Sequence, residues 1–139
     1  MADKPRRQEQ VSTRSLLDKL GVKPFQRISV IGVDDDTFWE RLIVRAADTV
    51  KGRLRKDSDL IFFAADSLAE LQQLARLKTY LVSNGAIWVV SRKGKAAKIK
   101  DVDVIAAAKA AGLVDNKVVS FSETHTTLRL VIPLNLRAS

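Results

Sequence analysis

Apolar residues gather in short runs along the chain, and each run is bounded by polar or turn-forming residues. Runs of this length that are rich in β-branched and aromatic residues predict strands buried on both faces of a parallel sheet. Three such strands are predicted, at residues 27–33, 59–64 and 86–90. Residues 49–56 are ambiguous, and a short edge strand over residues 50–54 is the interpretation that we favour.

Most of the stretches between these runs carry helical periodicity with start and stop signals. The first predicted helix covers residues 12–20, and Gly21 ends it. A second begins at the acids Asp34–Asp36, which suit a helix N-terminus because that end carries a partial positive charge. Its predicted apolar face is made by Phe38, Leu42 and Ala46.

Two further helices are predicted in the second half of the chain. The capping box Ser67-Leu-Ala-Glu70 begins a helix whose apolar face comprises Leu68, Leu71, Leu74 and Leu77. Asn84-Gly85 predicts a turn before the third strand, and an alanine-rich helix over residues 101–111 ends at Gly112. Residues 117–121 and 126–132 flank a polar turn and predict an antiparallel hairpin.

The alternation of strands and helices predicts a three-layer α/β domain. Its sheet is expected to be open and mostly parallel, with helices on both faces and a C-terminal antiparallel hairpin. We expect residues 13–139 to form this single domain and residues 1–12 to be a disordered basic tail.

Composition and charge narrow the function classes. The absence of cysteine excludes disulfides, thiolate metal sites and thiol nucleophiles. No apolar run reaches the roughly 18 residues that span a bilayer, and no signal-peptide core is present, so we expect no membrane association and a cytoplasmic location. The 24 Lys and Arg residues against 16 acids give a net charge of +8, which favours an anionic ligand or nucleic acid as partner.

Four sequence blocks stand out along the chain. They are Leu20-Gly-Val-Lys-Pro24, the strand Gly85-Ala-Ile-Trp-Val89 followed by Arg92-Lys93, Gly112-Leu-Val-Asp-Asn-Lys-Val118, and Glu123-Thr-His-Thr-Thr-Leu-Arg129. Together they resemble an uncharacterised bacterial family of short Rossmann-like domains with the methyltransferase-type fold. The resemblance covers residues 20 to 132 and implies a Rossmann-like fold without an established activity. His125 stands where that family usually has Trp.

A cofactor loop of the usual kind is missing from this sequence. Dinucleotide-binding sheets use a glycine-rich loop after the first strand and an acid after the second. Here one glycine, Gly32, precedes Asp34, and the region 50–56 ends in bases. We therefore expect no bound cofactor and no catalytic residues. The alternative is a cofactor- or nucleotide-binding enzyme, and its candidate site is a cleft at Gly32 and Asp34 that faces Arg92-Lys93.

The segment after the third predicted strand is a glycine-containing loop with five bases and no acid. Because it follows a parallel strand, it is expected at the carboxyl edge of the sheet, where open α/β domains bind ligands. A solvated loop without a ligand is the alternative interpretation. The candidate anion-binding residues are Arg92, Lys93, Lys95, Lys98 and Lys100.

Two polar motifs invite other interpretations. The acids Asp34–Asp36 with Asp66 suggest a degenerate receiver-like signalling domain, but a helix cap and a turn residue explain them more simply. His125 is the only histidine, so a metal site there is disfavoured, and a surface position with an exposed Glu123–Arg129 pair is expected. Trp88 is expected in the core.

The sequence thus favours a non-enzymatic binding or regulatory module that contacts an anionic partner through the basic loop. The alternatives are a methyltransferase-related enzyme that uses the cleft and the degenerate receiver.

Overall fold

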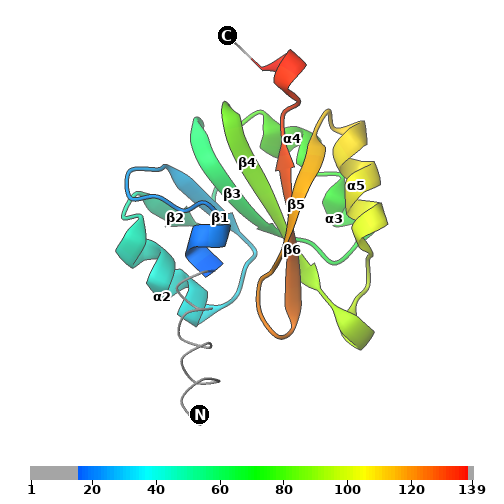
Figure 1. Ribbon diagram of the computed structural model, residues 1–139, viewed down its shortest axis with the longest axis horizontal. Helices are drawn as coiled ribbons and strands as arrows, with labels where there is room; N and C mark the ends of the chain where they lie inside the picture. The colour runs from blue at the N-terminus through cyan, green and yellow to red at the C-terminus, as the bar shows by residue number, and fades with distance from the viewer. Residues whose placement is uncertain (1–15, 138–139) are drawn as a thin grey trace, which may run out of the picture.

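Six strands form one mixed sheet in the computed structural model, which describes residues 16–137 (Figure 1). Their order across the sheet is β2-β1-β3-β4-β6-β5. The first four are parallel, and β6 runs antiparallel to both of its neighbours. The strands are β1 (Ile28–Ile31), β2 (Thr49–Lys51), β3 (Ser58–Ala64), β4 (Leu81–Arg92), β5 (Val114–Ser120) and β6 (His125–Val131).

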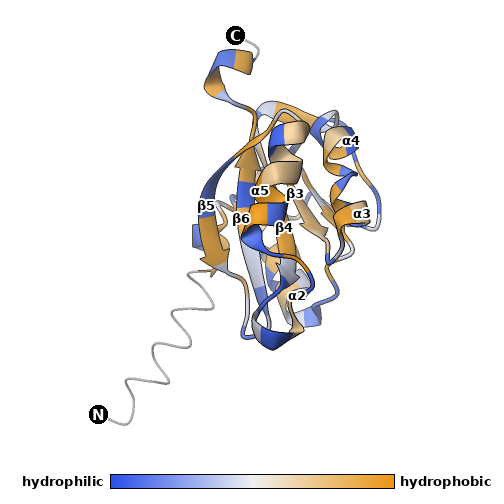
Figure 2. Ribbon diagram, turned by 90° about the vertical axis from the view of Figure 1, so that its right-hand side faces the viewer, coloured by the Kyte–Doolittle hydropathy of each residue, from blue (hydrophilic) through white to orange (hydrophobic). Residues whose placement is uncertain are grey.

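Helices cover both faces of this sheet, which confirms the predicted three-layer fold. A helical turn at residues 16–19 and α2 (Asp36–Arg45) pack on one face. The other face carries α3 (Leu68–Leu71), α4 (Leu74–Lys78) and α5 (Asp101–Ala110), and Figure 2 shows these helices beside the apolar strands. Two 3₁₀ turns, η1 (Gly94–Ala96) and η2 (Leu134–Leu136), complete the described elements.

The two faces of the sheet supply two separate apolar clusters. Strand residues alternate between them, so Phe62 and Trp88 face α2 while Ile61 and Ile87 face the other layer. Trp88 is fully buried, as predicted, and its indole N–H donates to the carbonyl of Leu20 over 3.0 Å. A buried indole needs such a partner, and this contact ties the N-terminal segment to the centre of the sheet.

The predicted turn at Asn84-Gly85 is wrong, because both residues lie inside β4. The pairing of β3 with β4 skips from Ser58–Leu81 to Leu60–Ala86, so β4 carries extra residues there as a bulge. Glycine is required at position 85 for space. A Cβ at this position would lie 2.7 Å from the carbonyl oxygen of Asp59 and 2.8 Å from Leu81 Cδ1.

The single helix predicted from the capping box at Ser67 is also wrong in part. The N-cap is confirmed, since Ser67 Oγ accepts the N–H of Glu70 over 3.0 Å, but the Glu70 carboxylate accepts the N–H of Asp66 instead of closing the box on the N–H of Ser67. The helix is divided into α3 and α4, however, by a turn at residues 72–73. Leu68 is exposed, whereas Leu71, Leu74 and Leu77 are buried. The break lets these three leucines reach the sheet without Leu68.

A strap of six residues, 52–57, replaces a helical crossover between β2 and β3. These strands flank β1 and run parallel to it, and such a connection usually takes a dozen residues or more. Gly52 and Asp57 bracket the strap with φ of 82° and 61°. Leu54 packs on the apolar cluster that also holds α3 and α4, so the strap contributes a side chain to the core on that face of the sheet.

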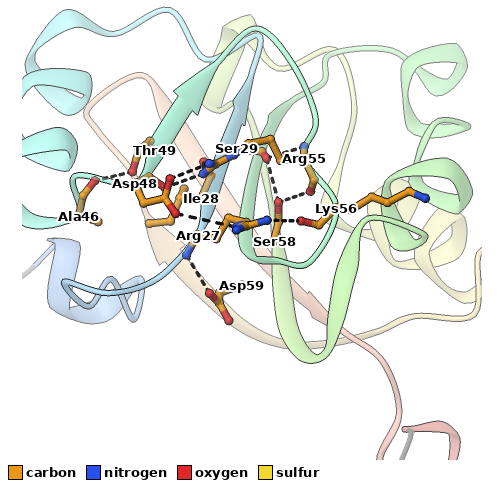
Figure 3. Close-up of polar contacts among 10 residues, drawn as sticks. All are labelled: Arg27, Ile28, Ser29, Ala46, Asp48, Thr49, Arg55, Lys56, Ser58 and Asp59. Atoms are coloured by element: carbon orange, nitrogen blue, oxygen red, sulfur yellow. Dashed lines mark hydrogen bonds and ion pairs between the residues drawn. The ribbon is translucent and has the colours of Figure 1, made fainter.

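A polar network fastens this strap to the amino ends of β1 and β3 (Figure 3). Arg55 donates from Nη1 to Asp48 Oδ1 over 2.6 Å and from its backbone N–H to Ser29 Oγ over 3.2 Å. The Ser58 hydroxyl donates its proton to the carbonyl of Arg55 over 2.6 Å. Ser29 must therefore be the donor in the 2.9 Å contact between the two buried hydroxyls. This network serves the fold.

The predicted tail at residues 1–12 and the start of the predicted first helix lie outside the described residues. Within residues 16–137, Gly21 ends the helical turn with φ 72°, as predicted. Among these same residues, none of the helices has both the length and the apolar character that crossing a membrane requires.

Candidate functional site

A cleft of about 340 Å³ opens at the carboxyl edge of the parallel strands. It lies at the ends of β1, β3 and β4, with the β5–β6 turn closing one side. Gly32 and Asp34, the predicted cleft residues, lie in its lining together with Arg92. The complete lining is Gly32, Val33, Asp34, Asp35, Ala64, Asp66, Val90, Arg92, Phe121, Thr124 and His125.

The wall formed by the β1–α2 loop is acidic. Gly32 turns the chain with φ 77°, and Asp35 caps α2 by accepting the N–H of Phe38 over 3.0 Å. In nucleotide-binding sheets, a phosphate occupies this helix N-terminus. Here the carboxylate of Asp35 takes that position, with Asp34 and Asp36 on either side. A phosphate is therefore disfavoured at this end of the cleft.

Asp66, which the sequence predicts as a turn residue, forms part of the opposite wall. It accepts the backbone N–H of Arg92 over 2.9 Å, and its second oxygen lies 3.8 Å from the Arg92 guanidinium. Glu70 accepts the N–H of Asp66 over 2.9 Å. The ends of β3 and β4 are thus joined by a carboxylate that also neutralises part of the charge on Arg92.

His125 is half-buried and lines the cleft, although the sequence predicted a surface position. It begins β6 directly opposite Arg92, and Thr124 Oγ1 lies 2.7 Å from its Nδ1. The expected Glu123–Arg129 pair is not among the ion pairs of residues 16–137. Across the same residues, acids and His125 do not form a group of three placed to hold a metal ion.

The basic loop lies beside the cleft and reaches it with one residue. Arg92 lines the cleft, while Lys93 donates to Ser120 Oγ over 2.8 Å. Lys95, Lys98 and Lys100 are exposed outside the lining. Ile99 is buried in the core, which anchors the loop. The cleft itself contains three carboxylates and one guanidinium, so the acids and the bases occupy separate parts of the carboxyl edge.

An adenosyl or dinucleotide cofactor does not fit the residues at the usual positions. The glycine-rich loop is absent after β1, and β2 ends at Lys51, followed by Gly52 and Arg53. The ribose-binding acid is expected at the end of the second strand, and Lys51 occupies that position here. Its Nζ lies 5.5 Å from the centre of the Trp39 ring.

The receiver interpretation does not match the sheet. A receiver sheet is parallel, in the order 2-1-3-4-5, whereas the strand beside β4 here is the antiparallel β6. Asp66, the candidate phosphoacceptor, is engaged with the end of β4.

Several solved structures similar to this chain are named as methyltransferases, at identities that show the fold alone. A SAM-dependent methyltransferase from Aquifex aeolicus matches with TM-score 0.68 and 14% identity, over 86% of this chain and 89% of that one. A precorrin-6y C5,15-methyltransferase from Geobacter metallireducens matches with TM-score 0.62 and 10% identity, over 86% and 87%. Fibrillarin from Aeropyrum pernix, solved with S-adenosyl-L-methionine, matches with TM-score 0.53 and 12% identity, over 79% and 68%.

Family comparison gives the more specific result. No curated protein matches the chain. A family model described as a protein of unknown function, DUF3052, matches residues 17–134 and therefore spans both faces of the sheet, the strap, the cleft and the basic loop. The chain belongs to the DUF3052 family, and its fold is the Rossmann-like fold of the methyltransferases.

Proposed function

We propose that this protein is a non-catalytic binding module that contacts an anionic partner through the exposed bases of the loop at residues 92–100. The observation that supports this most is the division of charge at the carboxyl edge. Lys95, Lys98 and Lys100 are exposed beside the cleft, whereas the cleft holds three carboxylates and a helix N-terminus already capped by Asp35. A polyanion is attracted to the loop and repelled from the cleft.

The loop has the properties of a phosphate-contacting surface. Its lysines are flexible point charges with free donors, which suit phosphates in variable positions. The buried Ile99 and the contact from the Lys100 N–H to Asp103 Oδ2, 2.8 Å long, fix the backbone that carries them. Such contacts position a nucleic acid without reading its sequence, and they weaken as salt rises. We take single-stranded RNA as the first probe.

The test compares the triple variant K95Q/K98Q/K100Q with the unchanged protein. Binding of a labelled RNA of about 20 nucleotides is measured by anisotropy between about 50 and 200 mM salt, with DNA of the same length in parallel. Losing three phosphate contacts should reduce the slope of log affinity against log salt by about 2.

The matched control is K23Q/K56Q/K109Q, which removes the same charge from three exposed lysines outside the loop. Equal loss of affinity in both triple variants would mean that net charge alone drives binding, and the loop would not be the working surface. Absence of RNA and DNA binding by the unchanged protein at the lower salt concentration would contradict the polyanion proposal directly.

The acidic cleft supports a second candidate function, the binding of a small molecule that carries a cationic group. Its volume falls at the lower end of the range for small-molecule sites, and Asp34, Asp66 and His125 provide its polar groups. Thermal shifts with S-adenosylmethionine, which carries a cationic sulfonium, test it, and S-adenosylhomocysteine shows whether that charge matters. ATP and NAD, whose phosphates the acidic wall disfavours, are the negative controls. A rise in melting temperature that persists at about 200 mM salt and disappears in D34N would favour the cleft over the loop as the binding site.

A further inference from the structure

A second pocket, of about 260 Å³, lies between the N-terminal segment and the β5–β6 hairpin. It shares no lining residue with the cleft. One wall is formed by residues 18–21, and the other by Lys117 of β5 and Arg129 of β6. Two hydrogen bonds hold the first wall in place, from the Trp88 indole to the Leu20 carbonyl and from Lys117 Nζ to the Lys19 carbonyl, each 3.0 Å long.

Two cations stand opposite each other in this pocket. Lys117 pairs with Arg129 across the β5–β6 ladder, and residues in such a pair have Cβ atoms about 5 Å apart. Like charges directly opposite each other are destabilising. Lys19, on the facing wall, adds a third base. The pocket therefore concentrates positive charge in a small volume.

Arg129 is the residue that most needs a counter-charge. It is half-buried, and it forms none of the ion pairs found among residues 16–137. Burial lowers the pKa of its guanidinium, and the charge of Arg137 lowers it further. Both effects mean that the surroundings disfavour the cation in the absence of an added anion.

Asp18 is the acid among the residues that line the pocket, and it is already paired with Arg45. Asp18 accepts from Arg45 Nη1 over 2.6 Å, on the side of α2. Lys117 uses one of its three ammonium protons on the Lys19 carbonyl, which leaves two donors for a ligand. Arg129 offers a planar fork of donors that matches two oxygens of a tetrahedral oxyanion.

The pocket also brings together segments from the four sequence blocks that carry the family resemblance. Gly21 comes from the block at residues 20–24, Lys117 from the block at residues 112–118, and Arg129 from the block at residues 123–129. Trp88, in the remaining block, supports the first wall. Segments distant in sequence thus meet at one basic pocket.

We propose that this pocket binds a phosphate group, as inorganic phosphate or as a small phosphate ester. Arg129 is the main ligand, with Lys117 and Lys19 completing the charge. The volume is below the range of about 300–1,000 Å³ that accommodates drug-sized molecules, which favours one phosphate with a small substituent over a nucleotide. This site is independent of the basic loop, because the two share no residue.

The test measures melting temperature against inorganic phosphate, glycerol phosphate and chloride at constant ionic strength. Phosphate should raise the melting temperature of the unchanged protein and chloride should not. A larger shift with glycerol phosphate than with inorganic phosphate assigns the site to an ester, and the reverse assigns it to the free anion. The Arg129 Nε–H signal in a nitrogen–proton NMR spectrum should move with the same phosphate dependence.

Three variants test whether Arg129 and Lys117 bind the phosphate. R129Q should weaken phosphate binding at least tenfold, and K117Q by a few-fold. R129K should bind with intermediate affinity, since it keeps the charge without the fork. Without phosphate, R129Q should be as stable as the unchanged protein or more stable, because the like-charge pair is removed. K117Q alters an exposed side chain and keeps the test valid if R129Q does not fold.

The loop variant K95Q/K98Q/K100Q separates this site from the proposed function, and it should bind phosphate normally. Loss of the shift in the loop variant but not in R129Q would assign the anion to the loop and overturn the pocket. Equal shifts in the unchanged protein, R129Q and K117Q would overturn it as well, as would the absence of any phosphate-specific shift.

Discussion

The carboxylate of Asp66 accepts the backbone N–H of Arg92 over 2.9 Å, and this contact joins the loop after β3 to the end of β4. Asp66 therefore positions a residue of the cleft wall through the main chain. Its contribution differs from that of an exposed ion pair, which rarely adds much to stability.

Replacing Asp66 with alanine should lower the free energy of unfolding by about 1–2 kcal/mol, because the Arg92 N–H loses a charged acceptor. D66N keeps an acceptor oxygen and should recover most of that loss. Urea denaturation of the three proteins measures the difference. Equal destabilisation by both variants would show that the charge, and not the hydrogen bond, is what matters.

Thr127 provides a test in the opposite direction, because its hydroxyl should lower the free energy of unfolding. The residue is 1% exposed, and its Oγ1 has no partner among residues 16–137. Substitution by valine keeps the shape and removes a buried polar group without a hydrogen bond, so T127V should raise the free energy of unfolding by about 1–2 kcal/mol. T127S, which keeps the hydroxyl and loses the methyl group, should be less stable than the unchanged protein.

Gly85 should not tolerate a side chain. In G85A the new Cβ would meet the Asp59 carbonyl at 2.7 Å, and backbone cannot move as a flexible side chain does. We expect a loss of about 1–3 kcal/mol, the usual cost of overpacking. G94A is the control, since Gly94 has open space around it and only the strain of φ 68° to bear. Thermal melts that rank G94A below G85A would contradict this account of the bulge.

The network at the strap predicts a pH dependence. The side-chain hydrogen bond from Arg55 is the main cause of the lowered pKa of Asp48, and the charges of Arg55 and Arg27 act in the same direction. A carboxylate whose folded-state pKa is depressed contributes stability above its unfolded pKa and loses it as pH falls through the folded value. D48N should therefore flatten the acid side of the pH–stability curve.

This pH effect should also shrink at high salt, because Asp48 is exposed and its ion pairs are screened. Denaturant titrations between about pH 2 and 7, at low and high salt, measure both effects. An unchanged acid limb in D48N would show that other carboxylates dominate acid unfolding.

The strands of this sheet were largely predictable, and the reasons are local. Residues such as Ile61, Phe62 and Val89 make short apolar runs that only a buried strand explains. The bulge at Asn84-Gly85 was not predictable, because this dipeptide usually marks a turn, whereas Gly85 is needed here because the Asp59 carbonyl, far away in the sequence, leaves no room for a Cβ. The break between α3 and α4 likewise depends on which leucines reach the sheet.

Only some of the residues that line the cleft could be predicted, because the others reach it through long-range strand pairing. Gly32 and Asp34 follow a recognisable strand, so their place at the carboxyl edge could be inferred from sequence. His125 and Thr124 reach the cleft because β6 pairs with β4, a contact between residues far apart in the chain. Arg129 and Lys117 meet through the bulged pairing of β5 with β6, where Asn116 is the extra residue. No local pattern marks that register.

The position of β6 has a consequence for how the chain matures on the ribosome. Of the six strands within residues 16–137, β6 is the last to be synthesised, yet it lies inside the sheet, between β4 and β5. Until it has emerged, one side of the long strand β4 remains without its hydrogen-bonding neighbour, and β5 has no strand to join. Unpaired strand edges favour aggregation. A polypeptide that ends within β6 would therefore expose an open, apolar sheet edge, and we expect chaperones to bind it.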